Sequence, residues 1–146
     1  RPAVNVGLSV SRVGGAAQTK AMKKAAGTIR IDLAQYREME VFTQFSSDLD
    51  EATKEQLQYG KGLMELLKQP LCHPMSLADQ VITLVTANNR LLLDVENKQT
   101  KDFQLRLLDF FHAEHKDIVD ELNNNKVLNE ELTEKIVAAV KEFKSR

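Results

Sequence analysis

Arg12 is the residue of this sequence best suited to chemistry on phosphate groups. It follows two serines, Ser9 and Ser11, and shortly precedes a glycine pair, so no neighbouring acid is placed to neutralise it. A guanidinium stays charged at physiological pH, and its planar fork of N–H donors matches phosphate oxygens. The residue types leave two interpretations open: Arg12 reaches a phosphate held by a neighbouring chain, or it is an ordinary surface arginine.

The segment after Arg12 only superficially resembles a phosphate-binding loop. It runs from Gly14 to Lys20 with the sequence GGAAQTK. A nucleotide-hydrolysing loop of the Walker type needs a glycine directly before the lysine and a serine or threonine directly after it. Thr19 precedes Lys20 here, and Ala21 follows it. The segment therefore predicts no self-sufficient ATPase of this class.

Histidine and cysteine residues are too scattered to predict a metal site or a nucleophile. His112 and His115 lie on either side of Glu114 in one predicted helix, whereas Cys72 and His73 lie in a predicted loop. Zinc sites are marked by paired C-x-x-C or H-E-x-x-H spacings, and the sequence contains neither. We expect solvated histidines, no metal site and no catalytic cysteine.

The segment that leads to Arg12 is predicted to be a β-strand. Apolar residues at every second position from Val4 to Val10 alternate with small polar ones, which is the period of a strand with one apolar face. No second segment of this kind follows. A lone strand cannot satisfy its own backbone hydrogen bonds, so we expect its sheet to lie in the rest of a longer protein or in another chain.

Beyond Gly14 and Gly15 the sequence predicts an all-α fold. Helical composition and apolar stripes indicate a helical bundle or superhelix of about five helices, preceded by one orphan strand. The first predicted helix covers residues 16–44 with a kink at Gly27. The others cover residues 51–68, 76–89, 100–123 and 129 onward. We expect Asp48 or Asp50, Ser76 and Asn129 to cap helix N-termini.

Composition limits the class of protein further. The 146 residues fit one domain, the single cysteine excludes an internal disulfide, and no apolar run approaches the roughly 20 residues of a membrane-spanning helix. Residues 1–37 contain seven basic residues against one acidic residue, and the remainder contains 13 against 20. We expect Lys20, Lys23 and Lys24 to form a solvated helix face, because no aromatic residues are interleaved for stacking on nucleic-acid bases.

Several long runs of residues resemble the alpha-subunit family of the rotary F-type ATP synthases. The first 23 residues, RPAVNVGLSVSRVGGAAQTKAMK, carry the clearest similarity. DLAQYRE at 32–38, SDLD at 47–50 and ELLKQ at 65–69 follow in the family's order. The resemblance implies that residues 1–15 are the end of a nucleotide-binding domain and that residues 16–146 are a C-terminal helical domain.

The resemblance also implies a role for Arg12. In this family the matching arginine enters the catalytic site of a beta subunit in trans, with Ser9 and Ser11 in the supporting segment. Catalysis, the synthesis or hydrolysis of ATP coupled to proton or other ion transport, is then expected only in the assembled complex and not in the isolated chain. The implied partners are the beta subunits and the central-shaft gamma subunit, which residues 46–50 would face. The implied location is peripheral, on the cytoplasmic face of a bacterial membrane.

A second, noncatalytic nucleotide site is implied as well, holding ATP or ADP with Mg²⁺. Arg1 and Pro2 match the family's adenine contacts, and Gln69 matches the first of two glutamines. Leu71 stands in place of the second glutamine, and the next two residues also depart from the family pattern. We therefore expect a looser adenine contact here. A different hypothesis stays open from the residues alone: a stand-alone helical interaction module without a catalytic role.

Overall fold

The computed structural model describes residues 4–5, 9, 11–43 and 49–146, and every regular element in these ranges is helical. In chain order the helices are α1 (Arg12–Ala17), α2 (Lys20–Ala26), α3 (Ile29–Thr43), α4 (Glu51–Leu66), α5 (Leu77–Asn88), the 3-10 helix η1 (Asn97–Gln99), α6 (Thr100–Glu114), α7 (Lys116–Asn125) and α8 (Glu130–Ser145). The predicted all-α class is confirmed. Most of the predicted strand over residues 4–10 lies outside the described residues. None of the described helices has the length and apolar composition needed to span a bilayer.

The first predicted helix is divided into α1, α2 and α3. Thr19 adopts an extended conformation with ψ 159°, and its Oγ1 accepts a hydrogen bond from the Met22 N–H at 3.2 Å, which begins α2. The second break follows α2 at Gly27, where the sequence predicted a kink. A threonine or serine that caps a helix starts a new one even where the composition on both sides is helical. The prediction of one continuous helix was therefore wrong at Thr19.

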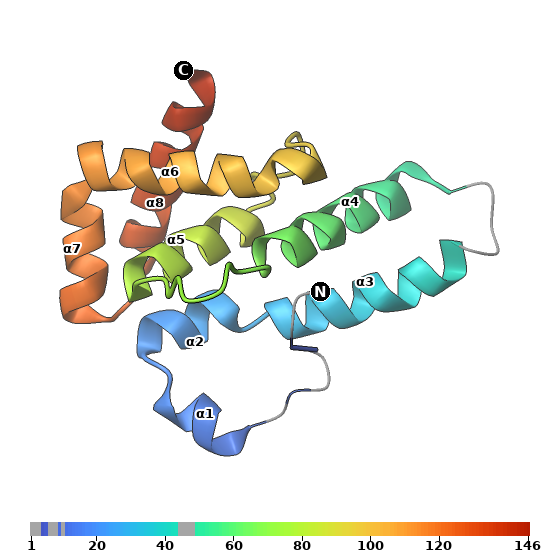
Figure 1. Cartoon of the computed structure of the whole chain (residues 1–146), viewed down its shortest axis with the longest axis horizontal. Coiled ribbons are helices and arrows are strands. Elements are labelled where there is room, and N and C mark those ends of the chain that lie inside the picture. The colour runs from blue at the N-terminus through green and yellow to red at the C-terminus, as the bar shows by residue number, and fades with distance from the viewer. Residues whose placement is uncertain (1–3, 6–8, 10, 44–48) are drawn as a thin grey trace.

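The helix predicted over residues 100–123 is divided as well. His115 has φ −124° and ψ 42°, which ends α6 and begins α7. Leu107 and Phe111 before the break and Ile118 and Leu122 after it are all buried at helical spacing. The helical spacing of the apolar residues is therefore the same before and after His115, and the sequence gives no signal that the chain turns there. Figure 1 shows α6 and α7 running in clearly different directions.

Three of the expected helix caps are present. In each, the side-chain oxygen accepts the N–H group three residues further on: Asp50 at 2.6 Å, Ser76 at 3.1 Å and Asn129 at 2.7 Å. A cap of this kind satisfies a donor that the helix itself cannot, and it stabilises a helix by about 0.5–2 kcal/mol relative to alanine. Asp48, the alternative cap for α4, lies outside the described residues.

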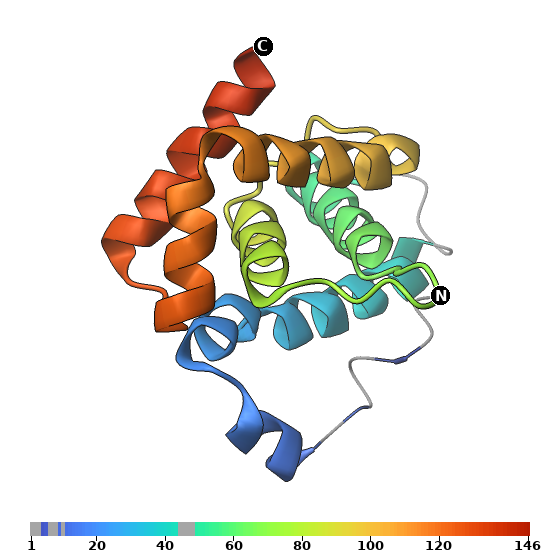
Figure 2. The same cartoon turned by 60° about the vertical axis from the view of Figure 1, so that its left-hand side comes forward.

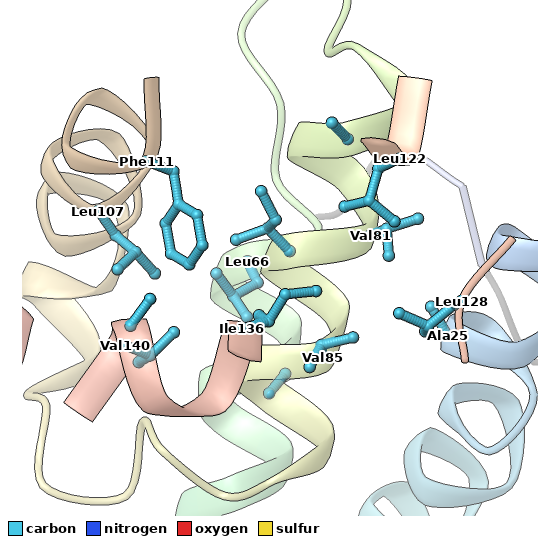
Figure 3. Close-up of a cluster of buried hydrophobic side chains, with 14 of the residues drawn as sticks. Ala25, Leu66, Val81, Val85, Leu107, Phe111, Leu122, Leu128, Ile136 and Val140 are labelled. Atoms are coloured by element: carbon cyan, nitrogen blue, oxygen red, sulfur yellow. The ribbon is translucent and has the colours of Figure 1, made fainter. Parts of the chain in front are cut away.

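Helix α5 is the centre of the fold. It packs against α2, α4, α6, α7 and α8, and the two overall views show it enclosed by these helices (Figures 1 and 2). The close-up in Figure 3 shows side chains of several helices gathered around it. Val81 of α5, Phe111 of α6, Leu122 of α7 and Ile136 of α8 are all completely buried. Each such side chain contributes roughly 1.5–3 kcal/mol through burial.

Helices α3 and α4 form an antiparallel pair that extends away from α5 (Figure 1). The two backbones approach closely at Gly60, because the buried ring of Tyr36 lies directly over it: a Cβ at position 60 would lie 2.2 Å from a ring carbon. The pair is also joined by the Tyr59 hydroxyl, which donates to Asp32 Oδ2 at 2.9 Å. Burial is the main cause that raises the pKa of Tyr36 to about 12.

Candidate functional site

Residues 11–19, here called the arm, carry Arg12 and stand apart from the rest of the helices. Helix α1 has no buried residue, and the side chain of Val13 is 81% exposed. The arm joins α2 through Gln18 and Thr19, where the chain is extended. Figures 1 and 2 both show α1 set off from the other helices. The arm therefore presents its side chains to solvent.

Arg12 is the first residue of α1. The sequence placed it after a predicted strand and before the first predicted helix; in the structure Ser11 caps a short helix that begins at Arg12 itself. The Arg12 side chain is exposed and forms no hydrogen bond or ion pair with any residue that the structure describes. Its positive charge is thus available to a group outside the described chain, and it carries no structural bond that such a group would have to break.

The two serines have different surroundings. Ser11 Oγ accepts a hydrogen bond from the Gly14 N–H at 2.9 Å, which fixes the turn around Arg12. A side chain at position 14 would approach the Ser11 hydroxyl to 3.0 Å, so the absence of a Cβ suits this turn. The Ser9 N–H donates to the Asn5 carbonyl at 2.9 Å. Ser11 therefore has a defined local role beside Arg12, whereas Ser9 is placed only by its backbone.

A hollow of about 580 Å³ lies between the arm and the helices behind it. Both charged side chains on its wall, Lys23 and Arg30, are basic. The other lining residues are polar, small or apolar: Ser9, Ser11, Gly14, Gly15, Gln18, Met22, Ala26, Gly27, Ile29, Leu67, Gln80 and Leu84. Volumes of 300–1,000 Å³ are typical of ligand pockets, and basic walls of this kind favour anionic or acidic partners.

Gln69 lies in the loop between α4 and α5. It is exposed, and its Nε2 donates to the sulfur of Met75 at 3.6 Å. Leu71, two residues further on, is 89% exposed, and Cys72 adopts a left-handed conformation with φ 60°. Arg1 and Pro2, the other predicted adenine contacts, lie outside the described residues. The structure therefore places Gln69 at the surface, beside Met75.

The loop and the arm share one face of the molecule. Leu67, where the loop begins, lines the same hollow as Ser9 and Ser11. Gln69 itself lines a neighbouring groove of about 610 Å³ between the loop and α6. Lys101 also lines this groove, and its Nζ donates to the Leu66 carbonyl at 2.7 Å. Burial lowers the pKa of this amine.

The histidine and cysteine residues do not converge. His112 Nε2 lies 2.8 Å from Asp79 Oδ1, and His115 Nε2 lies 3.4 Å from a carboxylate oxygen of Glu142. Cys72 is exposed in the loop after α4. Within the described ranges, no three His, Cys, Asp or Glu side chains gather as metal ligands would. His112 and His115 thus each lie beside a carboxylate, from α5 and α8 respectively.

Two residues that contact α2 were not recognised from the sequence as site residues. The Asn88 side chain donates a hydrogen bond to the Ala25 carbonyl of α2, and the Lys126 carbonyl accepts one from the Ala21 N–H. One sequence signal was available: Asn88 is a polar residue that follows the mostly apolar run VITLVTA at the end of α5. The exposed positions of Lys20, Lys23 and Lys24 on the same helix confirm the predicted solvated face.

The packed helices and the exposed arm define a helical domain preceded by a cationic segment, and the comparisons with known proteins give the family. The family model described as "ATP synthase alpha/beta chain, C terminal domain" matches residues 18–143. The chain therefore belongs to this family. It is 48% identical, over 144 residues, to ATP synthase subunit alpha from Clostridium kluyveri. That alignment covers 99% of this chain and 29% of the relative. It confirms the resemblance to the alpha subunit.

Proposed function

We propose that this chain acts as the C-terminal region of an alpha subunit in an ATP synthase and that Arg12 enters the catalytic site of a beta subunit as an arginine finger. The observation that carries the proposal is the extent of the similarity. The family match begins at residue 18. The alignment with the C. kluyveri subunit spans 144 of the 146 residues and therefore includes the arm. The exposed, unbonded guanidinium of Arg12 agrees with a role outside its own chain.

The chemistry assigned to Arg12 is electrostatic. Phosphoryl transfer spreads negative charge over the oxygens of the transferred group, and a fixed cation stabilises that charge without taking part in proton transfer. Arginine suits this role because it stays charged and its fork of donors fits two oxygens. Ser11 supports it by capping the turn that begins at Arg12, through its bond from the Gly14 N–H at 2.9 Å.

Gln69 is proposed as an adenine contact of a noncatalytic site that holds ATP or ADP with Mg²⁺, together with Arg1 and Pro2. The exposed Gln69 amide can donate to and accept from the edge of a purine when its hydrogen bond to the Met75 sulfur is broken. Leu71 is equally accessible but offers no hydrogen bond, which supports the looser contact predicted from the sequence. No residue of this chain is assigned as a Mg²⁺ ligand.

The remaining assignments follow from the same proposal. Residues 1–15 would end a nucleotide-binding domain, and residues 16–146 would form the helical domain beside the beta subunits and the central-shaft gamma subunit. The turn at residues 46–50 would face that shaft; within it, Asp50 is described and caps α4. The complex would couple ATP synthesis or hydrolysis to proton or other ion transport, peripheral to the cytoplasmic face of the membrane.

The decisive experiment replaces Arg12 in the complete alpha subunit and measures ATP hydrolysis by the assembled complex. We expect Arg12→Lys to lower kcat by about 10³-fold or more, because arginine fingers supplied in trans contribute about 10³–10⁵ to the rate. Assembly and nucleotide binding should stay near the wild-type level. Arg106→Lys is the matched control, since Arg106 is another exposed arginine but lies in α6, outside the arm and the hollow beside it. Near-normal turnover of the Arg12→Lys complex would exclude the proposed role.

A further inference from the structure

Helix α2 is the base on which the arm stands. Among the described residues the arm has no buried side chain of its own, so on the side of the helices its junction with α2 sets its direction. It continues directly into α2, whose Ala21 and Ala25 are almost completely buried, with exposed fractions of 0% and 1%. The placement of α2 therefore sets where the arm leaves the helices α2 to α8, here called the body.

Two hydrogen bonds from distant parts of the chain hold α2 near its two ends. Near its beginning, the Ala21 N–H donates to the Lys126 carbonyl at 2.9 Å. Near its end, the Asn88 Nδ2 donates to the Ala25 carbonyl at 2.7 Å. Figures 1 and 2 show α2 lying beside the end of α7 and beside α5, from which these two partners come.

Both bonds involve a local feature that is unfavourable by itself. Lys126 has φ 55°, the left-handed region that side chains other than glycine seldom adopt, and in this conformation it ends α7. The Asn88 Oδ1 is buried and has no hydrogen-bond partner within the described part of the chain. An apolar side chain of the same size would avoid that orphaned oxygen but would leave the Ala25 carbonyl without its donor, so the asparagine is kept at the cost of one unpaired oxygen to hold α2.

We propose that Asn88 and Lys126 are positioning residues for Arg12: they fix α2 at both ends and thereby set the direction of the arm. This inference rests on the proposed function of Arg12. It goes beyond that proposal because it assigns a role in turnover to the end of α5 and to the turn between α7 and α8. The physical reason is that electrostatic catalysis is sensitive to placement, and a displacement of about 1 Å costs about 10²-fold in rate.

The test uses complexes assembled with the complete alpha subunit. Asn88→Leu keeps the size of the side chain and removes the donor to Ala25. Lys126→Val disfavours the left-handed conformation, since a β-branched side chain is strained at positive φ. We expect each change to lower kcat for ATP hydrolysis by about tenfold, a fraction of the loss that an ångström of displacement produces, while KM changes less than twofold.

Matched controls separate positioning from general damage. Asn89→Leu removes an amide that donates to the Val85 carbonyl of its own helix at 2.8 Å, without contacting α2. Lys126→Gly keeps the left-handed conformation accessible. Both controls should keep kcat within twofold of wild type. An equal loss of turnover in Asn89→Leu, or unchanged turnover in both Asn88→Leu and Lys126→Val, would overturn the inference.

A double-variant cycle tests whether Asn88 acts through Arg12. If it does, Asn88→Leu should cause less than a twofold further loss in an Arg12→Lys complex, because the group that it positions is already gone. A full additional tenfold loss would show that Asn88 acts independently and would refute the inference while leaving the role of Arg12 intact. Near-normal turnover of Arg12→Lys alone would instead exclude the proposed function itself.

Discussion

The arm and the helical body meet at Thr19, yet different forces hold them. In the body, side chains from α5, α6, α7 and α8 form one core, in which Phe111 and Ile136 are completely buried. In the arm, α1 buries nothing, and a single side-chain cap from Ser11 defines its start. Stability is therefore concentrated in the body, while the cation with a proposed role in turnover lies in the arm. Segments that must engage another molecule are commonly drawn from the least stable part of a fold.

We expect the largest change in stability from a substitution at a closely packed glycine of the body. Gly60→Ala would place a methyl group 2.2 Å from the Tyr36 ring, so α3 and α4 would have to move apart. We expect a loss of about 1–3 kcal/mol in the free energy of unfolding, as is typical of overpacked cores. The measurement is urea denaturation followed by circular dichroism.

Two other glycines serve as controls for that change. A Cβ built at Gly62 in α4 or at Gly15 in α1 would meet no atom within 4 Å apart from its chain neighbours and the backbone of its own helix. Gly62→Ala should stabilise the protein by about 0.4–1 kcal/mol, because alanine lowers the entropy of the unfolded chain. Gly15→Ala should leave the urea midpoint unchanged, since α1 is not part of the cooperative core. A large loss of stability in Gly15→Ala would show that the arm does carry packing energy.

The same division explains what the sequence could predict. Apolar periodicity and caps act over three or four residues, so the all-α class and the caps at Ser76 and Asn129 followed from local patterns. The break at His115 did not, because buried residues keep the same spacing on both sides of it. Whether α6 and α7 continue or turn is decided by packing against α5 and α8, which no local pattern records.

The arm was predicted less well for the opposite reason. Alternating residues up to Val10 predicted a strand, and most of that segment lies outside the described residues. Arg12 is exposed, and it begins a short helix that the sequence did not predict. A strand depends on partner strands, whereas the hydroxyl of Ser11 is enough to start a short helix. Arg1 and Pro2 stay predictions, as does the adenine contact of Gln69.

A lower pH should reduce the stability of the body and leave the arm unchanged. The hydrogen bond from Lys144 to Asp94 is the main cause that lowers the pKa of this carboxyl in the folded state. A carboxyl with a lowered folded-state pKa stabilises the fold above its unfolded pKa, about 3.9, and this contribution is lost as the pH falls from there through the lower folded-state pKa. Because the pair is largely exposed, the contribution should not exceed about 1 kcal/mol. Asp94→Asn should flatten the pH dependence of the urea midpoint over this interval.

The control for the acid experiment is Asp109→Asn, because Asp109 is exposed and forms no ion pair with any described residue. Its pH profile should match that of the wild type. The arm contains no carboxylate between residues 11 and 19, so amide exchange there should change with pH only through the intrinsic chemistry of exchange. If Asp94→Asn left the pH profile unchanged, the Lys144 bond would not contribute to stability in solution.

The smallest expected effect lies in the arm itself. Ser11→Ala removes the oxygen that accepts the Gly14 N–H at 2.9 Å, and loss of a cap weakens a helix by about 0.5–2 kcal/mol. That loss should stay local, because α1 has no buried residue through which it could reach the core. We expect the urea midpoint to stay within error of wild type while the Gly14 amide exchanges several-fold faster, measured by NMR. Ser9→Ala should leave the Gly14 amide unchanged, since the bond that Ser9 forms is from its backbone. A lowered urea midpoint in Ser11→Ala would mean that the arm and the body unfold together, and the separation between a stable core and an exposed cation would no longer hold.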